Sequence, residues 1–331
     1  MRVINFSLDR SALQEGSLAQ KRLAALAAAV GEIVVLVPSG KSGKIRQFFD
    51  LWRRAERVLR DKKFDLITVQ DTAYLALLAY LLARTARVPF EVQVHGFEKL
   101  YGARKLLSGF VLRRADKIRV VSERLKRELI QRFTFNALRF YVLPVYTQMG
   151  AKGQMGERGT SKTFTFLTVG RLVPVKNIAL QIRAFARIAK EFPQAQLVIV
   201  GDGPERENLP RNDNVIFEGA QKDLSRFYQN ADAFLLTSNS EGWGVVITEA
   251  AAYGLPIIMT DVGLACEFIK NGENGIVIPV GDEDALVYAM KRIIEDAELR
   301  TILGRGAQKA FLALPTPEEY VKKQVLEWSL V

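Results

Sequence analysis

The sequence predicts an α/β protein with two doubly wound domains, each a parallel β-sheet covered by helices on both faces. Short apolar, β-branched segments alternate with helix-length segments along all 331 residues. Strands that are apolar on both sides are typical of parallel sheets buried between helices. The charge balance also changes at mid-chain, from +14 in residues 1–150 to −3 in residues 151–331. Because such a shift supports a domain boundary, we expect one near residue 150.

Six strands are expected in the first half, because runs rich in Val, Ile, Leu and Phe favour the extended backbone. They are Val3–Phe6, Ile33–Val37, Leu66–Val69, Phe90–Val94, Ile118–Val121 and Tyr141–Leu143. The helices expected between them include Ser17–Val30 and Ile45–Arg60. The apolar run Ala73–Ala83 is shorter than the about 20 residues that cross a bilayer, so we expect it to form a buried helix.

Six further strands are expected in the second half, with helices at Lys176–Glu191 and Asp282–Glu295. The strands are Phe164–Val169, Gln196–Val200, Val215–Phe217, Ala233–Leu236, Pro256–Met259 and Gly275–Ile278. The glycine-rich segment Thr147–Lys162 is typical of a linker. The sequence therefore predicts an N-terminal domain over residues 1–150 and a C-terminal domain over residues 151–315. In such folds the ligand lies at the carboxyl ends of the strands, here in the cleft between the domains.

The composition excludes several kinds of site. With one cysteine, Cys266, and one histidine, His95, the chain has neither a disulfide framework nor a zinc site built from His and Cys. The acidic triplet Asp282-Glu-Asp284 fits two hypotheses, a metal site on a sugar diphosphate or the cap of a helix. The segment Val37–Lys44 contains Gly-Lys-Ser but lacks the first glycine of a phosphate-binding loop. The first ten residues, MRVINFSLDR, lack the apolar stretch of a signal peptide.

Residues 238–256, SNSEGWGVVITEAAAYGLP, combine two carboxylates with a glycine turn. Glu241 and Glu249 stand eight positions apart, and Gly242-Trp-Gly244 lies beside the first. If this turn begins a helix, its free backbone N–H groups form an anion site. Glu241 would then lie at the mouth of the site and Glu249 about two turns further along the helix. The alternative is a pair of surface carboxylates beside a glycine turn.

A second segment, residues 169–177 (VGRLVPVKN), places two cations after a predicted strand. Gly170 ends the strand, Arg171 follows, and Lys176 is expected to open the next helix. Arg forms paired hydrogen bonds with phosphate oxygens and Lys acts as a point charge, so both are suited to neutralise a diphosphate. The alternative is that both are surface charges of a loop between a strand and a helix.

Together these segments resemble the retaining family 4 glycosyltransferases, enzymes with the GT-B fold, in which two Rossmann-like domains face each other across a cleft. The resemblance runs from about Phe164 to Phe311. It includes LVIVGDGPEREN (197–208), FEG (217–219), FYQNADAFLLTS (227–238) and GLPIIMTDVGLACEFIKNGENGIVIPV (254–280). In the less similar first half, FEVQVHGF (90–97) matches the family's strand that ends in His-Gly and faces the donor sugar.

The resemblance implies a reaction. A hexose or N-acetylhexosamine would move from a nucleotide-diphosphate sugar, UDP- or GDP-linked, to a hydroxyl of a glycan or lipid-linked acceptor. Retention at the anomeric carbon and independence of any metal or cofactor are implied as well.

The resemblance also implies residue roles. Arg171 and Lys176 would hold the donor diphosphate, Glu249 the ribose and Glu241 the sugar hydroxyls. The base would lie against the turns at Gly201–Gly203 and Gly219-Ala220. His95 either faces the sugar or is a satisfied loop histidine. The expected catalytic residues are His95, Arg171, Lys176 and Glu241. The expected donor-binding residues are Gly16, Gly170, Gly201, Gly203, Gly219, Ala220, Gly242, Trp243, Gly244, Val245, Val246 and Glu249.

Three alternative functions stay open. A nucleotide-sugar epimerase of the same fold typically needs additional acid and base side chains on the sugar face, and this chain has one histidine. A non-catalytic nucleotide-sugar-binding protein would be expected to lose Glu249 or Lys176, and both are present. A nucleic-acid binder would account for the basic first half, but no recognition motif accompanies the charge, so we expect no nucleic-acid partner.

The basic first half has a further implication. The stretches Lys41–Lys63 and Lys99–Arg132 place aromatic and leucine residues among nine and eleven cations. Basic helices with an apolar face bind anionic bilayers, and many members of the family act on lipid-linked acceptors. We therefore expect a cytoplasmic protein, peripheral on the cytoplasmic face of the membrane, unless these apolar residues face the domain core. By resemblance, the helix expected within residues 316–331 packs back on the first domain.

Overall fold

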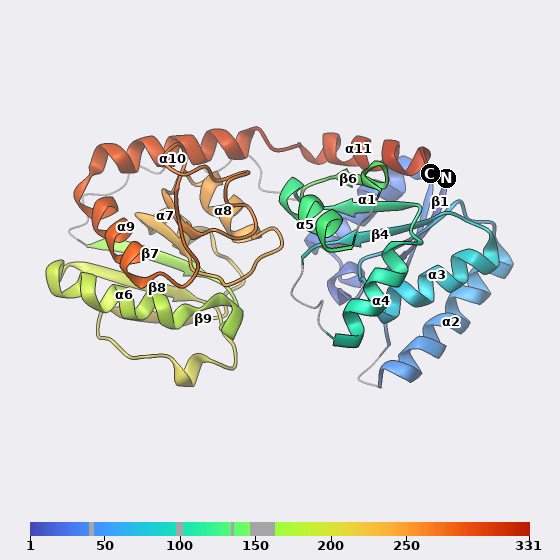
Figure 1. The fold of residues 1–331 in the computed structure, drawn as a ribbon, viewed down its shortest axis with the longest axis horizontal. Helices are drawn as coiled ribbons and strands as arrows, with labels where there is room; N and C mark the ends of the chain where they lie inside the picture. Colours follow the sequence, from blue (N-terminus) through green and yellow to red (C-terminus); the bar gives the residue numbers. More distant parts are fainter. Residues whose placement is uncertain (40–42, 97–101, 134–135, 146–162) are drawn as a thin grey trace. The chain divides into compact units, whose positions relative to one another are not determined.

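The computed structural model describes residues 1–39, 43–96, 102–133, 136–145 and 163–331. The chain divides into two compact units (Figure 1). The first comprises Met1–Gln148 and Pro315–Val331, and the second comprises Met149–Leu314. The expected linker Thr147–Lys162 lies outside the described residues.

The first unit contains a six-stranded parallel sheet with the strand order β2-β1-β3-β4-β5-β6. The strands are β1 (Arg2–Phe6), β2 (Glu32–Leu36), β3 (Leu66–Val69), β4 (Phe90–Val94), β5 (Lys117–Val120) and β6 (Phe140–Val142). Strand β1 pairs with β2 on one side and β3 on the other, so Val3 aligns with both Ile33 and Leu66. The order therefore reverses between β1 and β3, and at such a reversal neighbouring loops leave in opposite directions and open a crevice.

Helices accompany the sheet of the first unit. They are α1 (Leu18–Val30), α2 (Lys44–Asp61), α3 (Tyr74–Ala86), α4 (Gly102–Leu112), α5 (Glu123–Phe133) and α11 (Pro317–Ser329). Helix α1 begins at a Ser17 side chain that accepts from the Gln20 N–H, and it ends at Gly31, whose φ of 112° favours glycine. The apolar run Ala73–Ala83 forms most of α3 and is largely buried, as expected.

Helix α11 is fastened to the first unit by a carboxylate buried in the centre of the sheet. Glu91, in β4, is fully buried and accepts a hydrogen bond from Trp328 Nε1 of α11 at 3.0 Å. It also accepts from the hydroxyl of Tyr141, to which Gln324 of α11 donates in turn. The Trp328 ring packs with Val3 and other core residues of the same unit. Helix α11 thus supplies hydrogen bonds to the buried Glu91–Tyr141 pair in the middle of the N-terminal sheet.

The second unit repeats the plan with the order β12-β11-β10-β7-β8-β9, all parallel. The strands are β7 (Phe164–Val169), β8 (Ala195–Val200), β9 (Val215–Gly219), β10 (Ala233–Leu236), β11 (Ile257–Thr260) and β12 (Ile276–Ile278). The helices are α6 (Ile178–Glu191), α7 (Ser225–Asn230), α8 (Val245–Ala252), α9 (Glu283–Glu295) and α10 (Ala297–Leu312). Numbered within the unit, this order is that of a dinucleotide-binding sheet, and it reverses between β7 and β10.

The twelve strands form where the sequence predicts them, which confirms the fold class of two doubly wound parallel sheets. Several bounds shift by one or two residues, and one of these shifts has a clear structural cause. Lys176 does not open α6 but ends a 3₁₀ turn, Pro174–Lys176. Asn177 follows in the left-handed region with a φ of 49°, and α6 begins at Ile178. The left-handed residue breaks the helical path, and sequence periodicity does not indicate such a break.

We predict that Glu91→Ala destabilises the first unit by about 3 kcal/mol or more, because the Trp328 N–H and the Tyr141 hydroxyl lose their buried acceptor. Urea unfolding followed by tryptophan fluorescence measures the loss. Glu318→Ala, an exposed change on the same α11, is the control and should stay within about 0.5 kcal/mol of wild type. Equal stability of the Glu91 and Glu318 variants would contradict this role.

Candidate active site

The predicted diphosphate-binding segments meet at the strand-order reversal of the second unit. Strand β7 leads into the loop with Gly170, Arg171 and Lys176, and the adjacent β10 leads into the loop with Glu241. Because parallel strands end at the same edge of a sheet, both loops lie at the carboxyl edge. This is the position where doubly wound sheets bind ligands.

An ion pair joins the two loops. Lys176 Nζ contacts Glu241 Oε1, and the side chains are 18% and 6% exposed. Ser238 Oγ donates to the same carboxylate oxygen at 2.6 Å, and the Asn239 N–H donates to the Val175 carbonyl at 2.7 Å. Arg171 is exposed and has no carboxylate within 4.0 Å among the described residues. Lys176 is therefore held in place by its ion pair, whereas Arg171 is available to a ligand.

The turn that carries Lys176 is held by hydrogen bonds from buried side chains. Thr237 Oγ1 donates to the carbonyl oxygens of Lys176 and Asn177, at 3.3 and 3.1 Å. It accepts from Gln181 Nε2 at 2.9 Å, and the Gln181 amide oxygen accepts from the Thr168 hydroxyl in β7. All these side chains except Lys176 and Asn177 are buried. The position of the turn therefore depends on polar contacts inside the sheet, a form of preorganisation.

Two of the predicted glycines are required by close backbone approach. A Cβ at Gly201 would lie 1.8 Å from the Gly170 carbonyl oxygen, and one at Gly203 would lie 2.3 Å from that of Leu172. Gly201 donates its N–H to the Gly219 carbonyl oxygen at 2.8 Å. The loops after β7, β8 and β9 thus lie against one another, and Ala220 follows at the same edge.

The Gly242-Trp-Gly244 turn does begin a helix, as predicted. Gly244 is the N-cap of α8 in the left-handed region, with a φ of 79°. Val245 and Val246 form the first turn and are half-buried. Trp243 is buried, with its Nε1 lacking a partner among the described residues. The first N–H groups of a helix have no intrahelical acceptor, so this end of α8 is suited to an anion.

Glu249 has a different environment from Glu241. Tyr228 donates its hydroxyl hydrogen to Glu249 Oε2 at 2.6 Å, and the Tyr228 ring stacks on Tyr253 with 5.3 Å between centroids. Burial raises the pKa of the Glu249 carboxyl, although the Tyr228 hydrogen bond opposes this. Burial and the neighbouring Glu249 raise the pKa of Tyr228 as well. Tyr228 thus stays protonated and fixes one Glu249 oxygen, while the other is free to accept from a ligand.

His95 and Gly16 belong to the first unit. His95 follows β4 and lines a cavity of about 560 Å³ at the β1/β3 reversal, together with Ser7, Gln70 and Arg22. Burial lowers the pKa of the imidazole to about 3, with the positive charges of Arg119 and Arg22 adding to the effect. Nε2 has no hydrogen-bond partner among the described residues. Gly16, with a φ of 77°, directly precedes the Ser17 cap of α1.

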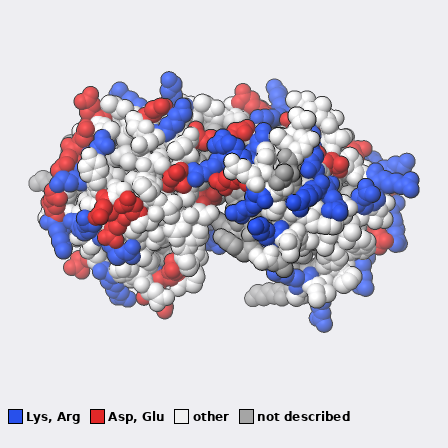
Figure 2. All heavy atoms as spheres, viewed as in Figure 1, with Lys and Arg blue, Asp and Glu red and all other residues white. Residues whose placement is uncertain are grey.

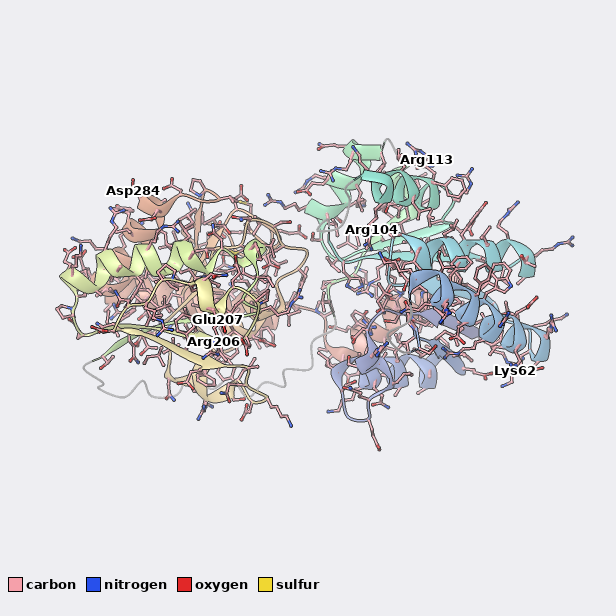
Figure 3. All side chains as sticks on the ribbon, turned by 90° about the horizontal axis from the view of Figure 1, so that it is seen from below. Lys62, Arg104, Arg113, Arg206, Glu207 and Asp284 are labelled. Carbon is pink, nitrogen blue, oxygen red and sulfur yellow. The ribbon has the colours of Figure 1, made fainter. Side chains whose placement is uncertain are left out.

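The acidic triplet Asp282-Glu-Asp284 caps helix α9 and forms ion pairs with α6. Asp282 caps α9 by accepting from the Ala285 N–H at 2.9 Å. Glu283 and Asp284 pair with Arg183 and Arg187, and Asp284 lies on the surface (Figure 3). Among the described residues no cluster of three His, Cys, Asp or Glu side chains could hold a metal ion.

Several residues of the site were not singled out from the sequence. Ser238, Tyr228 and Thr237 contact predicted residues through hydrogen bonds. Gly263 leaves room for Glu241, because a Cβ there would lie 2.8 Å from Glu241 Cβ. All four fall in segments that support the family resemblance, but their contacts reach across 21 to 61 positions for Tyr228, Gly263 and Thr237. No local pattern indicates such pairs.

Two family profiles match the chain. Residues 155–310 match "Glycosyl transferases group 1" and residues 11–145 match "Glycosyltransferase Family 4". The chain is 28% identical over 272 residues to N-acetyl-alpha-D-glucosaminyl L-malate synthase of Bacillus anthracis, covering 76% of this chain and 71% of that one. It is 26% identical over 270 residues to UDP-Gal:alpha-D-GlcNAc-diphosphoundecaprenol alpha-1,3-galactosyltransferase of Escherichia coli, covering 73% and 70%.

The fold is shared with a solved structure, Anabaena Alr3699/HepE in complex with UDP-glucose. The TM-score is 0.80 at 19% identity, over the whole of both chains. The protein has the GT-B architecture and belongs to the family 4 glycosyltransferases. It is a glycosyltransferase.

The single histidine permits a direct test of the cavity. We predict that the His95 ring protons keep constant NMR shifts between pH 8 and pH 5, because the folded chain leaves the imidazole neutral. Unfolding takes up a proton below the free histidine pKa of about 6.5, so stability should fall as the pH drops from about 6.5 towards 3. His95→Gln should weaken that pH dependence. A titration of the ring near pH 6.5 in the folded chain would show that His95 is solvated.

Proposed function

We propose that this glycosyltransferase moves a hexose or N-acetylhexosamine from a UDP- or GDP-linked donor to a hydroxyl of a glycan or lipid-linked acceptor, with retention and without a metal ion. The main support is the convergence of Arg171, Lys176 and the first turn of α8 at the β7/β10 reversal. Two cations and a helix N-terminus match the charge and the oxygen atoms of a diphosphate.

In the proposed mechanism the protein stabilises the leaving group. As the bond from the anomeric carbon to the diphosphate breaks, negative charge grows on the phosphate oxygens. Arg171, Lys176 and the N–H groups of Val245 and Val246 stabilise that charge at a preorganised site. Lys176 is already held by Glu241, so it loses little freedom when the donor binds. A metal ion is then not needed for charge neutralisation.

The remaining site residues hold the donor. The Glu249 oxygen that does not accept from Tyr228 accepts from the ribose hydroxyls. The base lies against the turns at 201–203 and 219–220. Glu241 binds sugar hydroxyls. Its Oε1 already accepts from Lys176 and Ser238, which makes it a poor nucleophile. We therefore favour a front-face route, in which the leaving phosphate helps to deprotonate the acceptor hydroxyl.

A second proposal concerns where the enzyme works. No helix among the described residues is long and apolar enough to cross a membrane. The outward face of α2 exposes Ile45 and Phe49, at 76% and 57%, beside Arg53 and Arg57. Figure 2 shows Lys and Arg side chains gathered over much of the visible face of the first unit. We propose that α2 lies on an anionic membrane at the cytoplasmic face. The diphosphoundecaprenol-linked acceptor named for the E. coli relative is consistent with this.

The first experiment incubates the protein with a panel of nucleotide sugars and acceptors and measures free nucleotide and glycosylated product. We expect product, and we expect Arg171→Ala and Lys176→Ala each to lower the rate by on the order of 100-fold or more, because leaving-group charge is no longer stabilised. Arg211→Ala, an exposed cation of the same unit, is the control. Near wild-type rates for both site variants would refute the assignment. Donor epimerised without transfer, or donor bound without turnover, would favour the two alternative functions.

The membrane proposal predicts salt-sensitive binding to anionic vesicles and none to zwitterionic ones. Arg53→Glu with Arg57→Glu should weaken binding about tenfold or more, since each cation near the surface contributes about 1 kcal/mol. Arg54 is left unchanged because it donates to the Val37 carbonyl oxygen at 2.9 Å. The control has the same charge change elsewhere, Arg211→Glu with Lys222→Glu, both exposed in the second unit. Equal binding to both vesicle types, or to neither, would exclude the proposal.

A further inference from the structure

The cavity of the first unit is lined by two arginines, and each has a buried hydrogen-bond donor without an acceptor among the described residues. It opens at the carboxyl ends of β1, β3 and β4 and has a volume of about 560 Å³. Arg22 from α1 and Arg104 from α4 both line it (Figure 3 labels Arg104). The acidic residues in its wall are Asp9 and Asp71.

Asp71 is already fully engaged. Its Oδ2 accepts from the N–H groups of Ala73 and Leu75, at 3.1 and 3.2 Å, and so caps the start of α3. Its Oδ1 accepts from Arg104 Nη2 at 3.0 Å. Arg104 Nε is buried and has no acceptor among the described residues. Arg104 is thus oriented by Asp71 and still has an unused donor.

Arg22 has no acidic partner. No carboxylate of the described residues lies within 4.0 Å of it, and its Nε is buried without an acceptor. Burial lowers the pKa of this guanidinium, and the positive charge of Arg119 adds to the effect, while Tyr320 and Asp9 oppose it. Arginine nevertheless stays protonated. Asp9 is not in direct contact with this buried cation, and a buried charge without a direct partner is costly, so Arg22 favours an incoming anion.

The neighbouring charges do not supply that anion. Arg119 is buried and bonds to neutral acceptors, Gln93 Oε1 at 2.9 Å and the carbonyl oxygens of Leu143 and Pro144. Asp9 is bonded to the Ser11 N–H at 2.9 Å at the start of a 3₁₀ turn. His95 is neutral at physiological pH, because burial lowers its pKa to about 3. The lining thus contains two aspartates and two arginines, but the Nε donors of Arg22 and Arg104 have no acceptor among the described residues.

We propose that this cavity binds an anionic group of the acceptor, a phosphate or a carboxylate, through Arg22 and Arg104. Guanidinium groups form paired hydrogen bonds with such oxyanions. The volume exceeds that of the anion alone and leaves room for the part of the acceptor next to it. The inference rests on the proposed function, because the donor diphosphate is assigned to the cations of the second unit. It identifies the acceptor as a charged molecule.

Inorganic phosphate is the first probe, titrated into the full chain and followed by ³¹P NMR and by thermal unfolding. We expect saturable binding and a raised Tm for wild type. Arg22→Gln should weaken phosphate binding at least tenfold and abolish the rise in Tm. Its own Tm without phosphate should change little, since the buried guanidinium that is removed has no carboxylate in direct contact. Arg104→Gln should weaken binding as well. Lys21→Gln and Lys105→Gln, exposed neighbours on the same helices, are matched controls and should bind as wild type.

UDP and GDP binding separates this inference from the proposed function. Arg22→Gln should bind either diphosphate as wild type does, which places Arg22 outside the donor site. An equal loss of diphosphate and phosphate affinity would place it in the donor site and overturn the inference. Absence of phosphate binding to wild type, or unchanged binding by Arg22→Gln, would overturn it too. A failed donor panel with intact phosphate binding would instead refute the proposed function.

A second pair of probes identifies the source of the anion. Polyprenyl phosphate is presented in phosphatidylcholine vesicles, and a soluble sugar phosphate is presented in solution. Vesicle binding that inorganic phosphate displaces and Arg22→Gln weakens indicates a lipid-linked acceptor. The same behaviour with the sugar phosphate alone indicates a soluble one. Either result supports the inference, and binding of neither probe contradicts it.

Discussion

The ion pair between Lys176 and Glu241 organises the functional edge of the second unit. It bridges the two loops that diverge at the β7/β10 reversal, the point where a doubly wound sheet leaves a crevice. Both side chains are largely buried, so each charge depends on the other and on Ser238 for compensation. Loss of either partner would leave a charge poorly solvated beside the proposed diphosphate. The cation is therefore positioned before the donor arrives.

The same principle of internal polar support recurs in both units. In the second unit, Thr168, Gln181 and Thr237 link the inside of β7 to the turn that presents Lys176. In the first unit, the buried Glu91 accepts hydrogen bonds from Trp328 of the last helix and from Tyr141 of β6. Buried polar groups of this kind are costly unless all their partners are in place. In both units, these hydrogen bonds hold in place the segments that lead to the ligand-binding edge of the sheet.

Much of the fold follows from local sequence patterns. The strand segments are short, apolar and β-branched, and all twelve appear where the sequence predicts them. Arg171, Lys176, Glu241 and the glycine turn also gather at one sheet edge, because parallel strands must end on the same side. The start of α6 was predicted two residues early, since the left-handed Asn177 depends on tertiary contacts of the turn. Tyr228 and Gln181 were not predicted because their hydrogen-bond partners are distant in sequence, and Arg22 was not predicted because the cavity that it lines is formed by distant segments.

The proposed function requires the loops at the β7/β10 reversal to bind a diphosphate without metal. Calorimetric titration of the full chain in excess EDTA with UDP, GDP and the corresponding monophosphates tests it most directly. We expect one of the two diphosphates to bind with a stoichiometry of one and with much higher affinity than its monophosphate. This difference should disappear in a variant with both Arg171→Ala and Lys176→Ala. No binding of either diphosphate in EDTA, or equal affinity for diphosphate and monophosphate in wild type, would contradict it.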